Sequence, residues 1–222
     1  MTLPPSPRTE IRRRPERARY DAEVVRCVLD EALVCHVGFV IDGQPVVIPT
    51  IHARHGDQLY LHGSPASRML RALGRQVDVC VTVTLVDGLV LARSAFHHSM
   101  NYRSVVVFGP ARDVADPVEK MVAFRALVDH VAPGRWEHVR APNDKEIRST
   151  LVLALPLAEA SAKVRTGPPI DDEVDYTLSI WAGELPLRTV PGAPLGDPRL
   201  APGAVVPEHV AGWRRTSSDV TR

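Results

Sequence analysis

The residues with the clearest chemical potential lie close together between Gln58 and Leu73, in the sequence QLYLHGSPASRMLRAL. We expect a strand at 59–62, a tight turn and then a helix, because Ser64 suits an N-cap and Pro65 suits the first helical position. Gly63 would let the backbone approach a ligand closely. The side-chain donors around this helix start are His62, Ser64, Ser67 and Arg68. Unpaired N–H groups and these donors predict a phosphate site, with an ordinary strand-to-helix connection as the alternative.

Neighbouring strands are expected to carry further polar groups. The strand expected at 45–52 offers backbone groups that could hydrogen-bond a planar heterocycle. Two other strands carry polar side chains that a purely buried strand would not need: Asn101, Arg103 and Ser104 on one, and Ser161, Lys163 and Arg165 on one face of the other. Each set alone could be a solvated sheet face. Together they form a cationic, donor-rich cluster that favours a phosphorylated cofactor.

Other catalytic chemistry has weaker support in the sequence. A G-x-S-x-G elbow is absent, which argues against a serine hydrolase. The nine histidines show no H-x-x-x-H or H-E-x-x-H spacing, and the adjacent His97 and His98 would point to opposite faces of an extended strand. The three cysteines match no metal spacing and lie in apolar surroundings, which is typical of buried thiols in a reducing compartment. We therefore predict no metal site.

The composition of the chain is that of a globular protein rather than a membrane or nucleic-acid-binding protein. Its 222 residues are 45% hydrophobic and 24% charged, with a net charge of +1. The arginines near the N-terminus could form a nucleic-acid arm, but no aromatic residues alternate with them, so a solvated tail or a strap is favoured. No long apolar run or secretory signal is evident, and we expect a cytoplasmic protein.

The elements that must position these residues are mostly strands joined by hairpins. The expected strands span 33–41, 45–52, 59–62, 77–86, 89–93, 102–114, 150–156 and 161–166. Asp42-Gly43 and Asp87-Gly88 are both strong hairpin-turn signals. Few helices interrupt the strands, and no βαβ alternation exists, so we predict a mainly β fold, a barrel or sandwich with peripheral helices. We expect an N-terminal arm at 1–19, one domain at 20–188 and an irregular tail at 189–222.

Five runs of sequence resemble one known family. They are DGQPVVIPT (42–50), LYLHGSPASRML (59–70), RSAFHHSMNYRSVVVFG (93–109), KVRTGPP (163–169) and WAGELPL (181–187). In this order they resemble the pyridoxamine 5′-phosphate oxidase-like flavoproteins, and in particular the flavin-nucleotide-binding subgroup that includes nitroimidazole-resistance proteins. The resemblance extends over about residues 20 to 200.

The resemblance implies an FMN-binding split β-barrel, usually a homodimer with the cofactor in a groove between subunits. Residues expected along the isoalloxazine and ribityl chain are Val47, Ile48, Pro49, Thr50, Ile51 and His52. The phosphate would be held by His62, Gly63, Ser67 and Arg68. Arg103 and Ser104 would approach the flavin from a neighbouring strand, and Trp181 would pack near the ring. Relatives of this barrel bind haem or a deazaflavin, so these remain alternative cofactors.

The function expected from the resemblance is FMN-dependent reduction of a small electron-poor or conjugated substrate, with NADH or NADPH as a possible electron donor. Arg103 is our candidate to stabilise the reduced flavin, and His52 and His98 are candidate proton donors. Only Arg188 lies near the place of the oxidase's C-terminal arginine-rich motif, so oxidation of pyridoxamine phosphate is not expected. A non-catalytic flavin or haem carrier, or a sensor, is the alternative. No membrane or nucleic-acid partner is expected.

Overall fold

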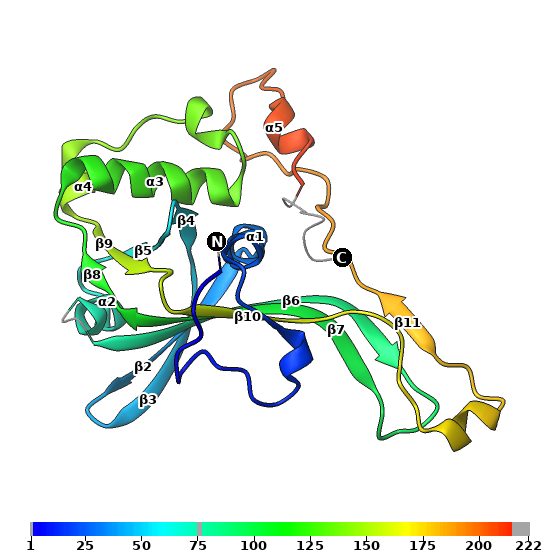
Figure 1. Ribbon diagram of the computed structural model, residues 1–222. Helices are drawn as coiled ribbons and strands as arrows, with labels where there is room; N and C mark the ends of the chain where they lie inside the picture. Colours follow the sequence, from blue (N-terminus) through cyan, green and yellow to red (C-terminus); the bar gives the residue numbers. More distant parts are fainter. Residues whose placement is uncertain (1, 75–76, 215–222) are drawn as a thin grey trace.

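The structure is a computed structural model that describes residues 2–74 and 77–214. Two antiparallel sheets make up most of its regular structure (Figure 1). The larger sheet has the order β1-β10-β7-β6-β2-β3, with β11 also paired to β6. Its strands are β1 (Ala18–Arg19), β2 (Val34–Ile41), β3 (Gln44–Ile51), β6 (Asp78–Leu91), β7 (Ser99–Pro110), β10 (Ala160–Arg165) and β11 (Gly183–Pro186). The smaller sheet has the order β4-β5-β9-β8, from β4 (Ala53–His55), β5 (Gln58–Gly63), β8 (Arg112–Asp113) and β9 (Leu151–Pro156).

Helices fill the space between and beside the sheets. α1 (Ala22–Glu31) contacts β4 of the smaller sheet and β6, β7 and β10 of the larger one, and α3 (Pro117–Val131) contacts β4. The shorter helices are α2 (Arg68–Leu73), α4 (Asp144–Arg148), α5 (Glu208–Ala211), η1 (Pro15–Arg17), η2 (Arg135–His138) and η3 (Glu173–Thr177). The expected mainly β fold with peripheral helices is confirmed. The larger sheet ends at β1 and β3 and does not close on itself, so the β architecture is split rather than a single closed barrel.

The β2–β3 hairpin forms where the sequence predicts it. Asp42 and Gly43 have φ values of 51° and 74°, and both central positions of a type I′ turn need positive φ. The strands pair from Ile41 and Gln44 at the turn to Val34 and Ile51 at the far end. This hairpin places β3 at the edge of the larger sheet.

The prediction of a second hairpin turn, at Asp87-Gly88, is wrong. β6 runs straight through this pair, and its register against β7 shifts between Val86 and Gly88, as at a bulge. β11 pairs with this part of β6, and a Cβ on Gly88 would lie 3.1 Å from the Leu185 carbonyl oxygen. Glycine is needed here because two strand backbones approach closely, not because the chain reverses.

The core lies around α1 and between the two sheets. Val25, Val28 and Leu29 on one face of α1 are buried against strand residues such as Val37 and Leu59. Asp116 caps α3 by accepting hydrogen bonds from the backbone N–H groups of Val118 and Glu119. Burial of these apolar side chains is the main force that holds the sheets together.

Both ends of the described chain pack on the rest of the domain. Residues 2–19 form a strap: the Leu3 N–H donates to the Tyr20 carbonyl at 2.7 Å, and Ala18 pairs with Lys163 of β10. At the other end the Trp213 indole N–H donates to the Val131 carbonyl at 2.8 Å. The far ends of β6 and β7, with β11, project from the main body (Figure 1). None of the helices described for residues 2–74 and 77–214 has both the length and the apolar character needed to span a bilayer.

Candidate functional site

The predicted phosphate turn connects β5 to α2. The residue that caps α2 is Ser67, whose hydroxyl accepts a hydrogen bond from the Leu70 N–H at 3.4 Å. Ser64, which we expected to be the cap, instead accepts from the Ala66 N–H at 3.1 Å, and its carbonyl accepts from the Ser67 N–H at 2.9 Å. An extra turn therefore precedes the helix. Because α2 is short, side-chain donors rather than its dipole must dominate any anion binding here.

The side chains around this turn differ in their accessibility to a ligand. Arg68 is exposed and forms no ion pair with any residue in the described ranges. His62 is half-buried, burial lowers its pKa, and its Nδ1 is buried without a hydrogen-bond partner there. A Cβ on Gly63 would lie 3.0 Å from the Leu70 side chain, so Gly63 lets β5 and α2 pack closely. The turn thus combines an accessible cation with a buried polar atom that lacks a partner.

β3 presents the second part of the predicted site. It is the end strand of the larger sheet, so one row of its backbone groups has no strand partner among the described residues. Val47, Pro49 and Ile51 are exposed, whereas Val46, Ile48 and Thr50 on the other face are half-buried. β3 also contacts β5, the strand that leads into the turn. Backbone donors and acceptors on β3 therefore lie near the strand that leads into the turn.

His52, just after β3, lies inside the protein. Its side chain is fully buried, its Nε2 lies 3.0 Å from the Leu29 carbonyl oxygen, and its ring lies 4.8 Å from that of His130. Burial, with a smaller effect from His130, lowers the pKa of His52 to about 4. The side chain packs between helices rather than facing solvent, so this geometry does not support its use as a proton donor to a substrate.

Arg103 forms a buried ion cluster. Its guanidinium donates to both Asp87 carboxylate oxygens at 2.8 and 2.7 Å, and to Glu31 Oε1 at 2.9 Å. Hydrogen bonds that these carboxylates accept from the guanidinium, Asp87 first, raise the pKa of Arg103 despite burial. The cluster connects α1, β6 and β7. The Arg103 guanidinium therefore points toward two carboxylates. This geometry does not support the predicted role of Arg103 at the flavin.

The polar residues predicted on β7 and β10 lie side by side. Ser104 pairs with Lys163, and Arg165 donates to the Asn101 side chain and to the carbonyls of Gly167 and Pro168, the latter two at 2.8 and 2.9 Å. Lys163 donates to the Arg13 carbonyl at 3.2 Å. These contacts hold the N-terminal strap and the segment after β10 in place. They do not bring this group to the turn at α2, which lies at the other end of the larger sheet (Figure 1).

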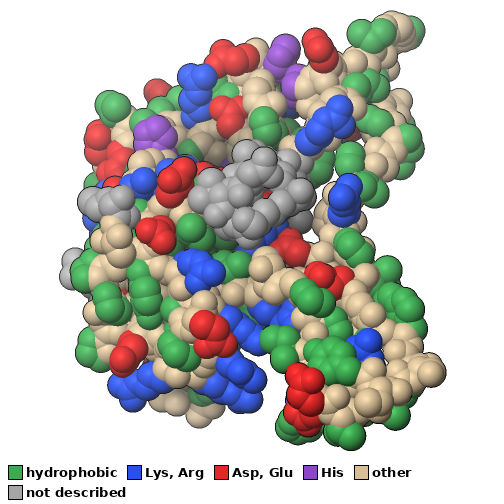
Figure 2. Space-filling view, turned by 45° about the vertical axis from the view of Figure 1, so that its right-hand side comes forward, with side chains coloured by type: hydrophobic (Ala, Val, Ile, Leu, Met, Phe, Trp, Pro, Cys, Tyr) green, Lys and Arg blue, Asp and Glu red, His purple; other side chains and the backbone are tan. Residues whose placement is uncertain are grey.

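The last two predicted residues lie on the projecting end of the molecule. His98 is exposed, and its Nδ1 lies 3.0 Å from the Ser94 carbonyl oxygen. Trp181 is also exposed, and its ring lies 3.0 Å from the position that a Cβ of Gly183 would occupy. Space-filling Figure 2 shows Lys and Arg side chains gathered beside the hollow between this end and the main body.

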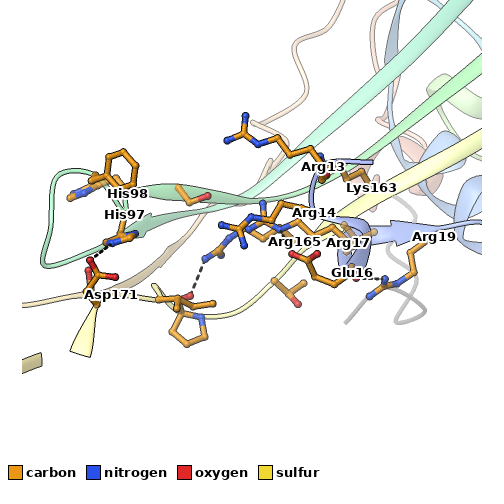
Figure 3. Close-up of a pocket in the computed structure, with 17 residues that line it drawn as sticks. Arg13, Arg14, Glu16, Arg17, Arg19, His97, His98, Lys163, Arg165 and Asp171 are labelled. Atoms are coloured by element: carbon orange, nitrogen blue, oxygen red, sulfur yellow. Dashed lines mark hydrogen bonds and ion pairs between the residues drawn. The ribbon is translucent and has the colours of Figure 1, made fainter. Parts of the chain in front are cut away.

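A cavity of about 960 Å³ near His98 is a feature that sequence reasoning missed. It is formed by the strap, the end of β10, the β6–β7 connection and residues 170–172 (Figure 3). The signals were present, because arginines crowd the N-terminus and cationic residues alternate on β10. Without the β1–β10 pairing, however, nothing in the sequence places the two groups together.

Comparison with known proteins gives consistent results. A family model described as pyridoxamine 5′-phosphate oxidase matches residues 21–164. The flavocytochrome Anf3 from Azotobacter vinelandii is 46% identical, with 96% of this chain and 99% of that one covered and a TM-score of 0.89. The FAD and haem binding protein from Mycobacterium smegmatis is 39% identical, with 88% and 96% covered and a TM-score of 0.85.

A more distant similarity fits the subgroup expected from the sequence. A protein described as a candidate 5-nitroimidazole antibiotic resistance protein from Bacteroides thetaiotaomicron is 26% identical, with 66% of this chain and 86% of that one covered and a TM-score of 0.57. A search of curated proteins found no match. The family resemblance inferred from the five sequence runs is confirmed.

Proposed function

The chain belongs to the pyridoxamine 5′-phosphate oxidase family, and from this premise we propose that it is a redox protein that binds a flavin nucleotide and a haem. The observation that carries the proposal is the similarity over nearly the whole chain to a flavocytochrome and to an FAD and haem binding protein. The second of these favours FAD over the FMN that the sequence suggested. A deazaflavin has no comparable support.

The turn between β5 and α2 fits the phosphate of a flavin nucleotide. Arg68 offers an exposed guanidinium, Ser64 and Ser67 offer hydroxyls, and His62 offers a buried Nδ1 that lacks a partner among the described residues. The unpaired backbone edge of β3 fits the polar edge of a planar ring. When bound, a flavin supplies hydride and electron transfer, and a haem supplies single-electron transfer. The role of these side chains is to bind and orient.

A homodimer remains part of the proposal. The exposed apolar side chains between residues 170 and 206 include Ile170, Val174, Tyr176, Leu178, Ile180, Trp181, Leu185, Leu187, Val190, Leu195, Leu200, Val205 and Val206. So many exposed apolar side chains along one segment favour a protein interface. Light scattering should give a mass of twice 24.4 kDa, and a monomer at micromolar concentration would refute the dimer.

The test of the proposed function is identification of the ligands released from purified protein. Denaturation followed by mass spectrometry should release FAD and haem, in amounts close to one of each per chain. Release of FMN would correct the nucleotide, and release of neither, with no uptake of added FAD or haemin, would refute the proposal. As substrate we propose a small electron-poor or conjugated molecule, the class that the family resemblance implies.

Turnover separates an enzyme from a carrier. Reduction of the bound flavin by NADH or NADPH, followed by reoxidation with a small acceptor, would favour an oxidoreductase. A flavin that stays oxidised in the presence of NADH and of NADPH would favour a carrier or sensor, or a different electron donor.

A further inference from the structure

The cavity beside His98 has the size and walls of a ligand site. Its volume of about 960 Å³ is at the upper end of the range for cofactor pockets. Apolar wall residues include Phe96, Val164, Pro168 and Ile170. Such a cavity can accept a large flat molecule. The candidate flavin-phosphate turn lies at the opposite end of the larger sheet (Figure 1), so this cavity is a separate site.

The charge around the cavity favours an anionic ligand. Six lining residues are cationic: Arg13, Arg14, Arg17, Arg19, Lys163 and Arg165. Three are acidic, and each already has a partner: Asp171 pairs with Arg93, Asp172 lies 3.4 Å from His97, and Glu16 lies 4.0 Å from Arg17. The guanidinium groups of Arg13 and Arg14, both drawn in Figure 3, form no ion pair with a described residue. A ligand with carboxylate groups would neutralise them.

The hydrogen bond of His98 to the backbone fixes a tautomer whose other ring nitrogen could ligate a metal. Its Nδ1 lies 3.0 Å from the Ser94 carbonyl, and because a carbonyl can only accept, Nδ1 carries the proton of the neutral ring. The lone pair is then on Nε2. A backbone carbonyl that fixes the tautomer in this way is the usual outer contact of a metal-bound histidine. The neighbouring His97 differs, since its Nε2 faces the Asp172 carboxylate.

Apolar wall residues, two arginines without ion pairs to described residues and a tautomer-fixed imidazole together match the chemistry of haem. We propose that this cavity is the haem site, that His98 Nε2 would ligate the iron, and that Arg13 and Arg14 would bind the propionates. The inference rests on the proposed function for the presence of haem. It goes further in giving the N-terminal strap a role, because the strap supplies the propionate partners.

The experiment compares haem and flavin content of the holoprotein in four forms: wild type, His98→Ala, Arg13→Gln with Arg14→Gln, and the control His55→Ala on β4. We expect His98→Ala to lose at least about tenfold in haem affinity and to shift the Soret band. Added imidazole should restore that band. The arginine variant should bind haem more weakly with an unchanged Soret position. His55→Ala should match wild type, and all four forms should keep their flavin.

The outcomes separate the two proposals. Wild-type protein that carries flavin but cannot take up haemin refutes the haem half of the proposed function, and this site with it. Haem bound with wild-type affinity and spectrum by His98→Ala refutes only the site. A fifth form, His97→Ala, completes the test: loss of haem in this variant but not in His98→Ala also refutes the site, because it moves the ligand to the neighbouring residue.

Discussion

Replacement of Arg103 by Met tests the buried ion cluster. The substitution keeps most of the side-chain volume but removes the guanidinium shared by Glu31 and Asp87. The Arg103 and Glu31 side chains are only 10% and 11% exposed, whereas Asp87 is 34% exposed. Breaking a fully buried pair costs about 3–5 kcal/mol. Since water can reach Asp87, we expect the lower end of that range, about 3 kcal/mol.

The assay is urea denaturation at neutral pH, with Arg125→Met as the matched control. Arg125 pairs with Glu137 on the surface, where both side chains are more than half exposed, and such a pair contributes about 0–1 kcal/mol. Equal losses in the two variants would refute the reasoning. The Arg103 variant also tests the sequence-based role at the flavin. Unchanged stability with loss of flavin would show that this arginine serves the cofactor and not the fold.

Three further predictions follow from individual contacts. Arg68→Ala should weaken flavin binding by about 10- to 100-fold, since a charge-assisted hydrogen bond contributes ~1.5–3 kcal/mol; flavin titration that shows no change would remove Arg68 from the site. His52 has a pKa of about 4 in the folded protein and about 6.5 in the unfolded chain. As the pH falls, the unfolded chain therefore binds this proton first, and the free energy of unfolding should fall by about 2 kcal/mol from pH 7 to pH 5. Urea denaturation at both pH values should show a smaller fall in His52→Gln. Gly88→Ala should separate β11 from β6, because the new Cβ would lie 3.1 Å from the Leu185 carbonyl oxygen. The free energy of unfolding should fall by about 1–3 kcal/mol. Limited proteolysis should cut near β11 faster than in the control Gly192→Ala, where a new Cβ would have no neighbour within 4 Å.

The sequence was informative where local chemistry decides the structure. The turn at Asp42-Gly43 follows from the backbone conformation of two adjacent residues. The pair Asp87-Gly88 carries the same local signal as Asp42-Gly43, yet β6 continues through it, because β11 arrives from about a hundred residues away to pair with it. A local pattern cannot report such a partner.

In the candidate site, too, the local features were predictable from the sequence and those that depend on distant segments were not. The donors of the turn at His62 to Arg68 are contiguous in sequence and were predictable as a group. The directions of the His52 and Arg103 side chains depend on α1, which supplies the Leu29 carbonyl and the Glu31 carboxylate. The cavity depends on the pairing of Ala18 with Lys163, which no periodicity in the strap reveals.

The most direct measurement is the absorption spectrum of the purified protein, oxidised and after reduction with dithionite. We predict flavin bands in the blue and near-ultraviolet together with a sharp Soret band, and on reduction the flavin bands should bleach while the Soret band shifts. A colourless protein that also fails to take up added FAD and haemin would contradict the account.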